Sequence, residues 1–476
     1  MSDKSPSLLP NEPPSSFPEN DNNDQPEQSL VGQSSENKDP ESLLTFVVQS
    51  LIPLLLAGIG LIGTGLLLHK WQNEIFFRQV HEAMMLSPAL LGLKGNLEMT
   101  LASRMATISH LGKLDSTAER LKIFGVNLAL VQCQAIVVSL FATIITVVTD
   151  VVRCHSFQSF DALLLASAAV TGTCLSAVVL GFLIMSMLMV SQKLKFNPDN
   201  VVTPLTASLG DLVTFLFFIG SGTLYLTICK DRYCWISSAV LTAAGLLLPL
   251  WIYLAYKSPH TRPTLQWGWF SIAFAATISC GGGYILELAV EQFENISLFQ
   301  PLLAGLAGNR AAVQCSRLCS WFFIHFKTPG EVPPEDSYWR RINPWYTFSC
   351  GDIHSKTAVV LVLTAIPYQF LFFSLTVAVD GSWLLFNYKL IGFYMIAAFI
   401  QVILLMYITQ LVVYVLWRLK TDPDHSSIPI LTSLSDLMGS GFIYIVFKVL
   451  HSMDPTAIGI TQDFPISSNS TFNCST

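Results

Sequence analysis

Two aspartates occupy the same place in two similar sequence patterns. Residues 198–211 read PDNVVTPLTASLGD and residues 423–436 read PDHSSIPILTSLSD, so both fit P-D-x4-P-x3-S-L-x-D. In a helix the second proline, the serine and the final aspartate fall at i, i+4 and i+7, on one face. The proline leaves a backbone carbonyl one turn earlier without a partner. Carboxylate, hydroxyl and carbonyl oxygens are the ligands that a hard cation prefers. We therefore interpret Asp211 and Asp436 as ligands of one cation site that face each other across one pathway.

A second pattern also occurs twice. Residues 88–104 read PALLGLKGNLEMTLASR and residues 301–317 read PLLAGLAGNRAAVQCSR, and both fit P-x3-G-x2-G-N-x6-S-R. The glycines allow close helix contact or an unwound turn, and the asparagine can cap a half-helix or offer a carbonyl to a hydrated ion. Glu98 in the first copy aligns with Ala311 in the second, so the repeat assigns Glu98 no role.

These patterns give two sets of candidates besides the two aspartates. The pathway candidates are Ser208, Ser433, Asn96, Asn309, Thr206, Thr432 and Asn127. The candidates for a structural role are Pro204, Pro429, Gly95, Gly308, Arg104 and Arg317, the two arginines as anchors at the cytoplasmic interface. A charge at bilayer depth costs about 3 kcal/mol on insertion scales, so such residues normally face a bundle interior.

The composition is that of a membrane protein. Of the 476 residues, 52% are hydrophobic and only 12% are charged, whereas a soluble domain has about 25% charged residues. Residues 1–42 hold nine acidic residues and two lysines, more negative charge than the formal net charge of −6 of the whole chain. This polar segment is expected to be a disordered tail, and neither part of the chain has the basic patches that bind nucleic acid.

Eleven apolar segments are long enough to cross a bilayer, which needs about 20 residues. They lie near 44–69, 84–110, 122–150, 161–190, 201–228, 235–256, 266–290, 298–326, 356–380, 388–418 and 427–449. The second and the eighth contain proline, glycine and polar residues. We therefore expect them to be broken or re-entrant, and to face the protein interior.

Both patterns recur in the same order, which predicts a duplicated five-helix unit. Copies that point the same way must be separated by an odd number of spans, and five spans, one linker span and five more satisfy this condition. The predicted fold is an all-α polytopic membrane protein of two parallel repeats that functions as a single chain. Its expected parts are a cytoplasmic tail (1–42), a first repeat (43–230), a linker helix (231–258), a second repeat (259–452) and an extracellular tail (453–476).

The Lys and Arg residues in the connections predict the orientation. Thirteen lie on the side of the N-terminal tail and seven on the opposite side, which favours a cytoplasmic N-terminus. The C-terminus then lies outside, where Asn469 and Asn473 stand in N-glycosylation triplets. On that side Cys229 and Cys234 flank a short loop and could pair in an oxidising space. We expect the plasma membrane as the location.

The patterns resemble those of a known family. PALLGLKGNLEMTLASR and NPDNVVTPLTASLGDL look like the first half of the solute carrier family 41 magnesium transporters, and GLAGN, QCSR and PDHSSIPILTSLSDL are similar to the second half. That family is related to the bacterial MgtE channels, in which two five-helix units form a central pore. The resemblance implies two fused MgtE-like units, a Mg²⁺ site at Asp211 and Asp436, and Mg²⁺ efflux coupled to Na⁺.

Other functions stay open from the sequence. One is a channel or uniporter for Mg²⁺ or other divalent cations without Na⁺ coupling. Another is an intramembrane aspartyl protease, which also has two aspartates on different spans, although here both aspartates lie in matching motifs and the Gly-Asn elements would have no task. A third is an assembly subunit that does not transport.

Overall fold

The computed structural model describes residues 43–110, 116–155, 157–194, 202–229, 235–258, 261–326, 330, 343–349, 351, 353–421 and 423–458, which form helices and no β-strand. The long helices are α1 (Leu43–Trp71), α3 (Glu82–His110), α4 (Thr117–Cys154), α5 (Ser159–Leu194), α6 (Val202–Ile228), α7 (Trp235–Tyr256), α9 (Trp269–Gln292), α10 (Ile296–His325), α13 (Ile353–Asp380), α14 (Tyr388–Arg418) and α15 (Pro423–Met453). The short ones are α2 (Ile75–Gln79), α8 (Arg262–Trp267), α12 (Pro344–Phe348), η3 (Trp383–Leu385) and η4 (Pro455–Ile458).

Each long helix covers one of the eleven predicted apolar segments. Within the described ranges, nine of them are long and apolar enough to cross a membrane. The other two are α3 and α10, which carry polar and charged residues along their length. The prediction of an all-helical membrane protein is therefore confirmed. The tails at 1–42 and 459–476 lie outside the described residues.

The prediction that the second and eighth segments are broken or re-entrant is wrong, because α3 and α10 are both continuous helices. Pro88 and Pro301 lie inside them. A proline removes only one backbone donor, and the residues one turn earlier, Met84 and Ser297, are buried against other helices. Irregular hydrogen bonding is tolerated at membrane depth where protein covers it, so neither helix has to unwind.

Helices α1 and α9 each pack against helices from both the first and the second half of the sequence. α1 contacts α6, α10 and α13, whereas α9 contacts α15, α3 and α4. A side chain at Gly65 of α1 would collide with the carbonyl oxygen of Leu298 in α10, and one at Gly283 of α9 would collide with that of Met85 in α3. Glycine at both positions therefore allows helix backbones to touch.

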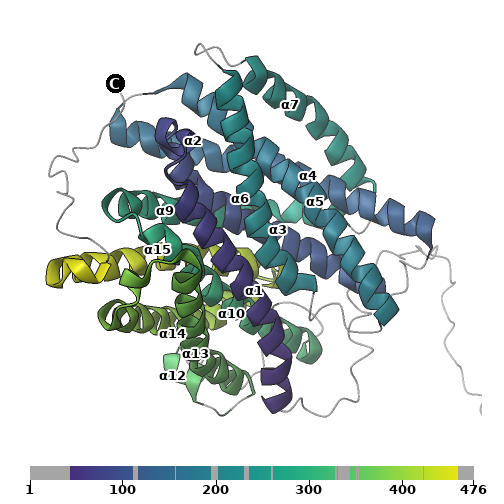
Figure 1. Cartoon of the computed structure of the whole chain (residues 1–476). Coiled ribbons are helices and arrows are strands. Elements are labelled where there is room, and N and C mark those ends of the chain that lie inside the picture. The colour runs from purple at the N-terminus through teal and green to yellow at the C-terminus, as the bar shows by residue number, and fades with distance from the viewer. Residues whose placement is uncertain are drawn as a thin grey trace, which may run out of the picture. The chain divides into compact units, whose positions relative to one another are not determined.

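Helix α7 lies at the edge of the bundle, beside α4 and α5 (Figure 1). Among its described side chains only Ser237 and Ala255 are buried, and Leu246 is 76% exposed. A helix that is apolar all round and not covered by protein is typical of a membrane span. The most exposed long helix is thus the one predicted to link the two repeats.

Candidate functional site

Three carboxylates from three helices interact inside the bundle, one of them fully buried and the other two half-buried. Asp211 lies in α6 and Asp436 in α15, and the charge of Asp211 interacts with Asp436 and with Glu98 of α3. α3 packs against both α6 and α15. The helix expected to face the interior therefore brings a third acidic residue to the two aspartates.

The Asp436 carboxylate fits into a space left by a glycine. A Cβ at Gly92 of α3 would collide with Oδ2 of Asp436 and would lie 3.4 Å from Oγ of Ser279 in α9. The Ser279 hydroxyl is fully buried and faces the carboxylate. Apart from each other, this hydroxyl and Oδ2 of Asp436 have no partner in hydrogen-bond geometry among the described residues. Since buried polar groups normally have partners, these two oxygens can accept a bound ligand.

Around Asp211, the glycine makes room for a neighbouring glutamate and not for the aspartate itself. Glu98 is fully buried, and a Cβ at Gly210 would collide with its Oε2. Thr214, one turn further along α6, is also fully buried, and its hydroxyl has no hydrogen-bond partner. Sequence symmetry assigned Glu98 no role, whereas the structure places this side chain against the residue that precedes Asp211.

The spacing of these groups indicates how a cation would be held. Among the described residues, no three His, Cys, Asp or Glu side chains lie close enough together to bind one metal ion directly. Mg²⁺ loses water reluctantly and is typically bound through one or two carboxylates with several waters retained. The site is suited to a divalent cation that keeps part of its hydration shell.

The candidates near Asp436 on α15 use their hydroxyls within the helix. Ser433 is buried and donates to the Ile430 carbonyl at 2.9 Å. Thr432 donates to the carbonyls of Ile428 at 3.0 Å and of Pro429 at 3.1 Å. The hydroxyl that faces Asp436 therefore comes from Ser279 of α9, outside both repeated patterns. Nothing in the aspartate motif indicates it.

Two other candidates on α10 and α4 are placed as follows. Gly308 lets α10 approach α15, since a Cβ there would lie 3.3 Å from the Cβ of Ser435. Asn127 of α4 is buried and donates to the Ile123 carbonyl at 3.0 Å, while its Oδ1 has no hydrogen-bond partner. Asn309 of α10 is half-buried, and Thr206 of α6 is fully buried.

The arginines of the glycine pattern differ from each other. The guanidinium nitrogens of Arg104 are buried and have no hydrogen-bond partner among the described residues, which does not fit an anchor that reaches water at the interface. Arg317 is half-buried. Of the remaining candidates, the backbones of Gly95, Asn96, Pro204 and Ser208 lie in α3 and α6, but their side-chain environments fall outside the described part of the structure.

The chain is similar to transporters of one family over most of its length. The model of the MgtE family, described as a divalent cation transporter, matches residues 87–221 and 300–446. Solute carrier family 41 member 3 of Rattus norvegicus is 36% identical over 413 residues, which cover 86% of this chain and 88% of the relative. This chain belongs to solute carrier family 41, within the MgtE divalent cation transporters. Solute carrier family 41 member 2 of Mus musculus is 36% identical over 428 residues, 88% of this chain and 73% of the relative. No solved structure gives a significant match.

Membership of solute carrier family 41 settles the class of the protein. It is an integral membrane transporter of divalent cations and not an enzyme, so the protease alternative is set aside. The two segments that match the MgtE model contain all three central carboxylates. Ser279 lies between these segments.

Proposed function

We propose that this solute carrier family 41 member moves Mg²⁺ through a pathway between two pseudo-symmetric halves, with Asp211 and Asp436 as its ligands. The observation that carries the proposal is the pair of buried oxygens, Oδ2 of Asp436 and Oγ of Ser279, which have no other partner among the described residues. A hydrated Mg²⁺ can satisfy both through its water while the aspartates balance its charge. Other divalent cations of similar size would compete for the same oxygens.

Two pairs of matching helix contacts support the proposal that the chain consists of two pseudo-symmetric halves. The first pair is Gly65 with Leu298 and Gly283 with Met85; the second is Gly63 with Leu212 and Gly281 with Leu437. The matched glycines are 218 positions apart, and their partners are 213 or 225 positions apart, the offsets at which the two sequence patterns recur. Equivalent residues therefore make equivalent contacts, as two parallel repeats related by an axis along the membrane normal would.

For the orientation, we propose a cytoplasmic N-terminus and an extracellular C-terminus in the plasma membrane. Cys154, at the end of α4, and Cys229, directly after α6, are both disulfide-bonded. Disulfides persist in oxidising spaces, and the loop charges assign the same end of these helices to the outside. Cys234 and the two glycosylation triplets lie outside the described residues. Maleimide labelling of intact cells before and after reduction with an impermeant phosphine tests this placement.

We further propose that Mg²⁺ efflux is coupled to Na⁺, with Glu98 adding a third carboxylate beside the two aspartates. The test is Mg²⁺ flux into proteoliposomes that hold a Mg²⁺-sensitive dye, with Na⁺ gradients of either sign. Flux that reverses with the Na⁺ gradient supports exchange, and flux indifferent to Na⁺ leaves a channel or uniporter. Full flux in an Asp211→Asn, Asp436→Asn double variant would refute the site, and no flux in the wild type would favour an assembly subunit.

A further inference from the structure

One face of α9 leads from the candidate site to the end of the bundle. Ser279, Gly283 and Glu287 are spaced by four residues and lie on one side of the helix. At 1.5 Å per residue, Glu287 is about 12 Å from Ser279 along the axis. α4 packs against α9, and the Cys280 thiol donates to the Ala142 carbonyl across this contact at 3.8 Å.

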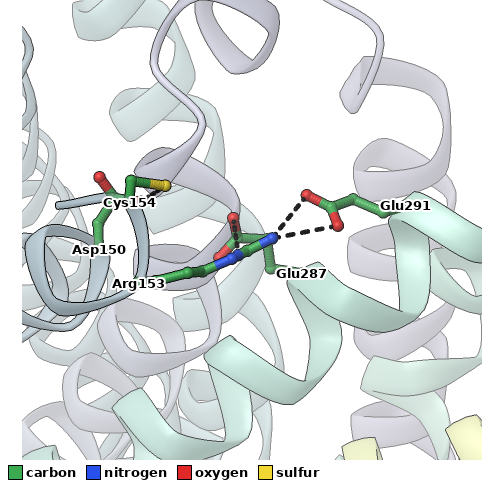
Figure 2. A network of polar contacts seen from close by, with 5 residues as sticks. All are labelled: Asp150, Arg153, Cys154, Glu287 and Glu291. Atoms are coloured by element: carbon green, nitrogen blue, oxygen red, sulfur yellow. Dashed lines mark hydrogen bonds and ion pairs between the residues drawn. The ribbon is translucent and has the colours of Figure 1, made fainter. Parts of the chain in front are cut away.

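Acidic residues gather where this face ends. Arg153 of α4 donates to Oε1 of Glu287 at 3.1 Å and to both carboxylate oxygens of Glu291 at 3.3 Å (Figure 2). Asp150, one turn earlier on α4, interacts with Glu82 at the start of α3. We call the five carboxylates that interact here the acidic mouth: Glu82, Asp150, Asp161, Glu287 and Glu291. Arg153 interacts with Asp150 and Glu287, and His81 interacts with Asp150.

Two buried hydroxyls lie between the acidic mouth and Asp436. Thr146 of α4, one turn from Asp150 on the same face, is fully buried, and its hydroxyl faces the Cys280 thiol and has no other hydrogen-bond partner among the described residues. The Cys280 thiol itself donates to the Ala142 carbonyl. Ser279, at the Asp436 end of the same helix contact, is also fully buried, and its hydroxyl faces only the Asp436 carboxylate. Two such hydroxyls along one helix contact mark positions where water or a hydrated ion can bind.

The opposite side of the bundle, formed by α1, α10 and α13, differs at the matched positions. With the offset of 218 between α1 and α9, Leu61 stands in place of Ser279 and His69 in place of Glu287. Leu61 fills the space over Gly305, the residue matched to Gly92. The polar inner position is thus replaced by an apolar side chain, and the acidic outer position by an imidazole.

The matched threonine is also different. Thr146 and Asp150 share the pattern T-V-x-x-D with Thr376 and Asp380 of α13. The Thr376 hydroxyl donates to the Phe372 carbonyl at 2.7 Å, so it needs no further partner. Of the two quasi-equivalent sides, the one formed by α4 and α9 therefore has two buried hydroxyls, Ser279 and Thr146, that are not bonded to a backbone carbonyl of their own helix.

We propose that the cation pathway opens to one side only, between α4 and α9, and that the acidic mouth is a second binding site for a hydrated divalent cation. At this site the cation competes with the Arg153 guanidinium for Glu287 and Glu291, and Glu82 and Asp150 provide further negative charge. The proposal rests on the proposed transport function. It adds a site that is independent of Asp211 and Asp436.

The test uses a Glu82→Gln, Asp150→Asn double variant, which leaves the ion pairs of Arg153 in place. Its half-saturating Mg²⁺ concentration in proteoliposome flux is expected to rise about tenfold, as for the loss of about 1.4 kcal/mol of binding. The matched control is a Glu294→Gln, Asp380→Asn double variant at the same end of the opposite side, where Glu294 is exposed and Asp380 is half-buried. It is expected to change this value less than twofold, as is usual for charges at the surface. Equal values for the two double variants would overturn the proposal.

A binding measurement separates this proposal from the transport function. Mn²⁺ binding to the purified protein, read from the free-ion electron paramagnetic resonance signal, should persist at one weak site in the Asp211→Asn, Asp436→Asn variant. Adding Glu82→Gln and Asp150→Asn should abolish that site, provided that size-exclusion elution is unchanged. Loss of all binding in the first variant would overturn the second site while leaving Asp211 and Asp436 as ligands. If the quadruple variant still binds Mn²⁺ at the weak site, the assignment of the second site to the acidic mouth is overturned as well.

Discussion

The carbonyl oxygen of Met85 in α3 lies against Gly283 of α9, in the space that a side chain at position 283 would occupy. Because the obstacle is backbone, the helices themselves would have to move apart. Gly283→Ala is therefore expected to lower the free energy of unfolding by about 1–3 kcal/mol, the usual cost of overpacking. Thermal unfolding in detergent measures the change. The control is Gly245→Ala in α7, where no atom lies within 4 Å. A similar loss in both variants would contradict the explanation.

Gly92→Ala is expected to impair transport more than stability. A methyl group at this position would occupy the place of Oδ2 of Asp436 and approach the Ser279 hydroxyl. The carboxylate would have to turn away from the pathway, and misplacement of a ligand costs about 1–3 kcal/mol of binding, a loss of affinity of about fivefold to 140-fold. The half-saturating Mg²⁺ concentration in liposome flux measures this. Gly305→Ala, which would meet only the flexible end of Leu61, should have a much smaller effect.

Arg310 provides a test of buried charge. It is fully buried in α10, donates to the Leu306 carbonyl at 2.9 Å, and lies over the Tyr368 ring at 5.2 Å. Replacing a buried charge by an apolar residue of similar size is often neutral or stabilising. Arg310→Met should therefore unfold at the wild-type temperature or above it, whereas Arg310→Ala should lose about 2–4 kcal/mol by leaving a cavity. Equal losses in both variants would show that the charge itself stabilises the fold.

The ion pair after α15 should give a pH-dependent contribution. Nζ of Lys389 donates to Oδ2 of Asp454 at 2.6 Å, and this hydrogen bond holds the pKa of Asp454 below its usual value. With a depressed folded-state pKa, the stabilisation is complete above the pKa of the unfolded chain and is lost as pH falls through the folded-state value. Asp454→Asn should slightly lower the unfolding temperature at neutral pH, and the difference should shrink as the pH falls below the ordinary aspartate pKa of about 3.9. A difference that does not change with pH would argue against the ion pair.

The fold follows from the sequence because the length of an apolar segment determines a membrane-spanning helix. All eleven long helices lie where the apolar segments predict them. The continuity of α3 and α10 could not be predicted, because the cost of Pro88 and Pro301 depends on which neighbours cover the freed carbonyls. Only the packed structure shows that Met84 and Ser297 are buried.

The candidate site is harder to predict from the sequence, because its side chains are only partly repeated in the two halves. Both aspartates stand in matching motifs, whereas Glu98 aligns with Ala311 and Ser279 aligns with Leu61. A repeat reveals only the residues that both halves share, so the side chains that make the two sides different are lost. The one available signal for Ser279 was its place just before the three glycines of α9, which predicts close packing and no ligand role.

In the proposed two-repeat organisation, the peripheral helix α7 joins the two halves into one polypeptide. In an assembly of identical subunits every mutation appears twice, and neither copy can change alone. Here a mutation that converts one half leaves the other as it was, so selection can act on Ser279 without touching Leu61. A linker of this kind would let the two halves diverge, so that one side carries ions, as proposed, while the other side only packs the bundle.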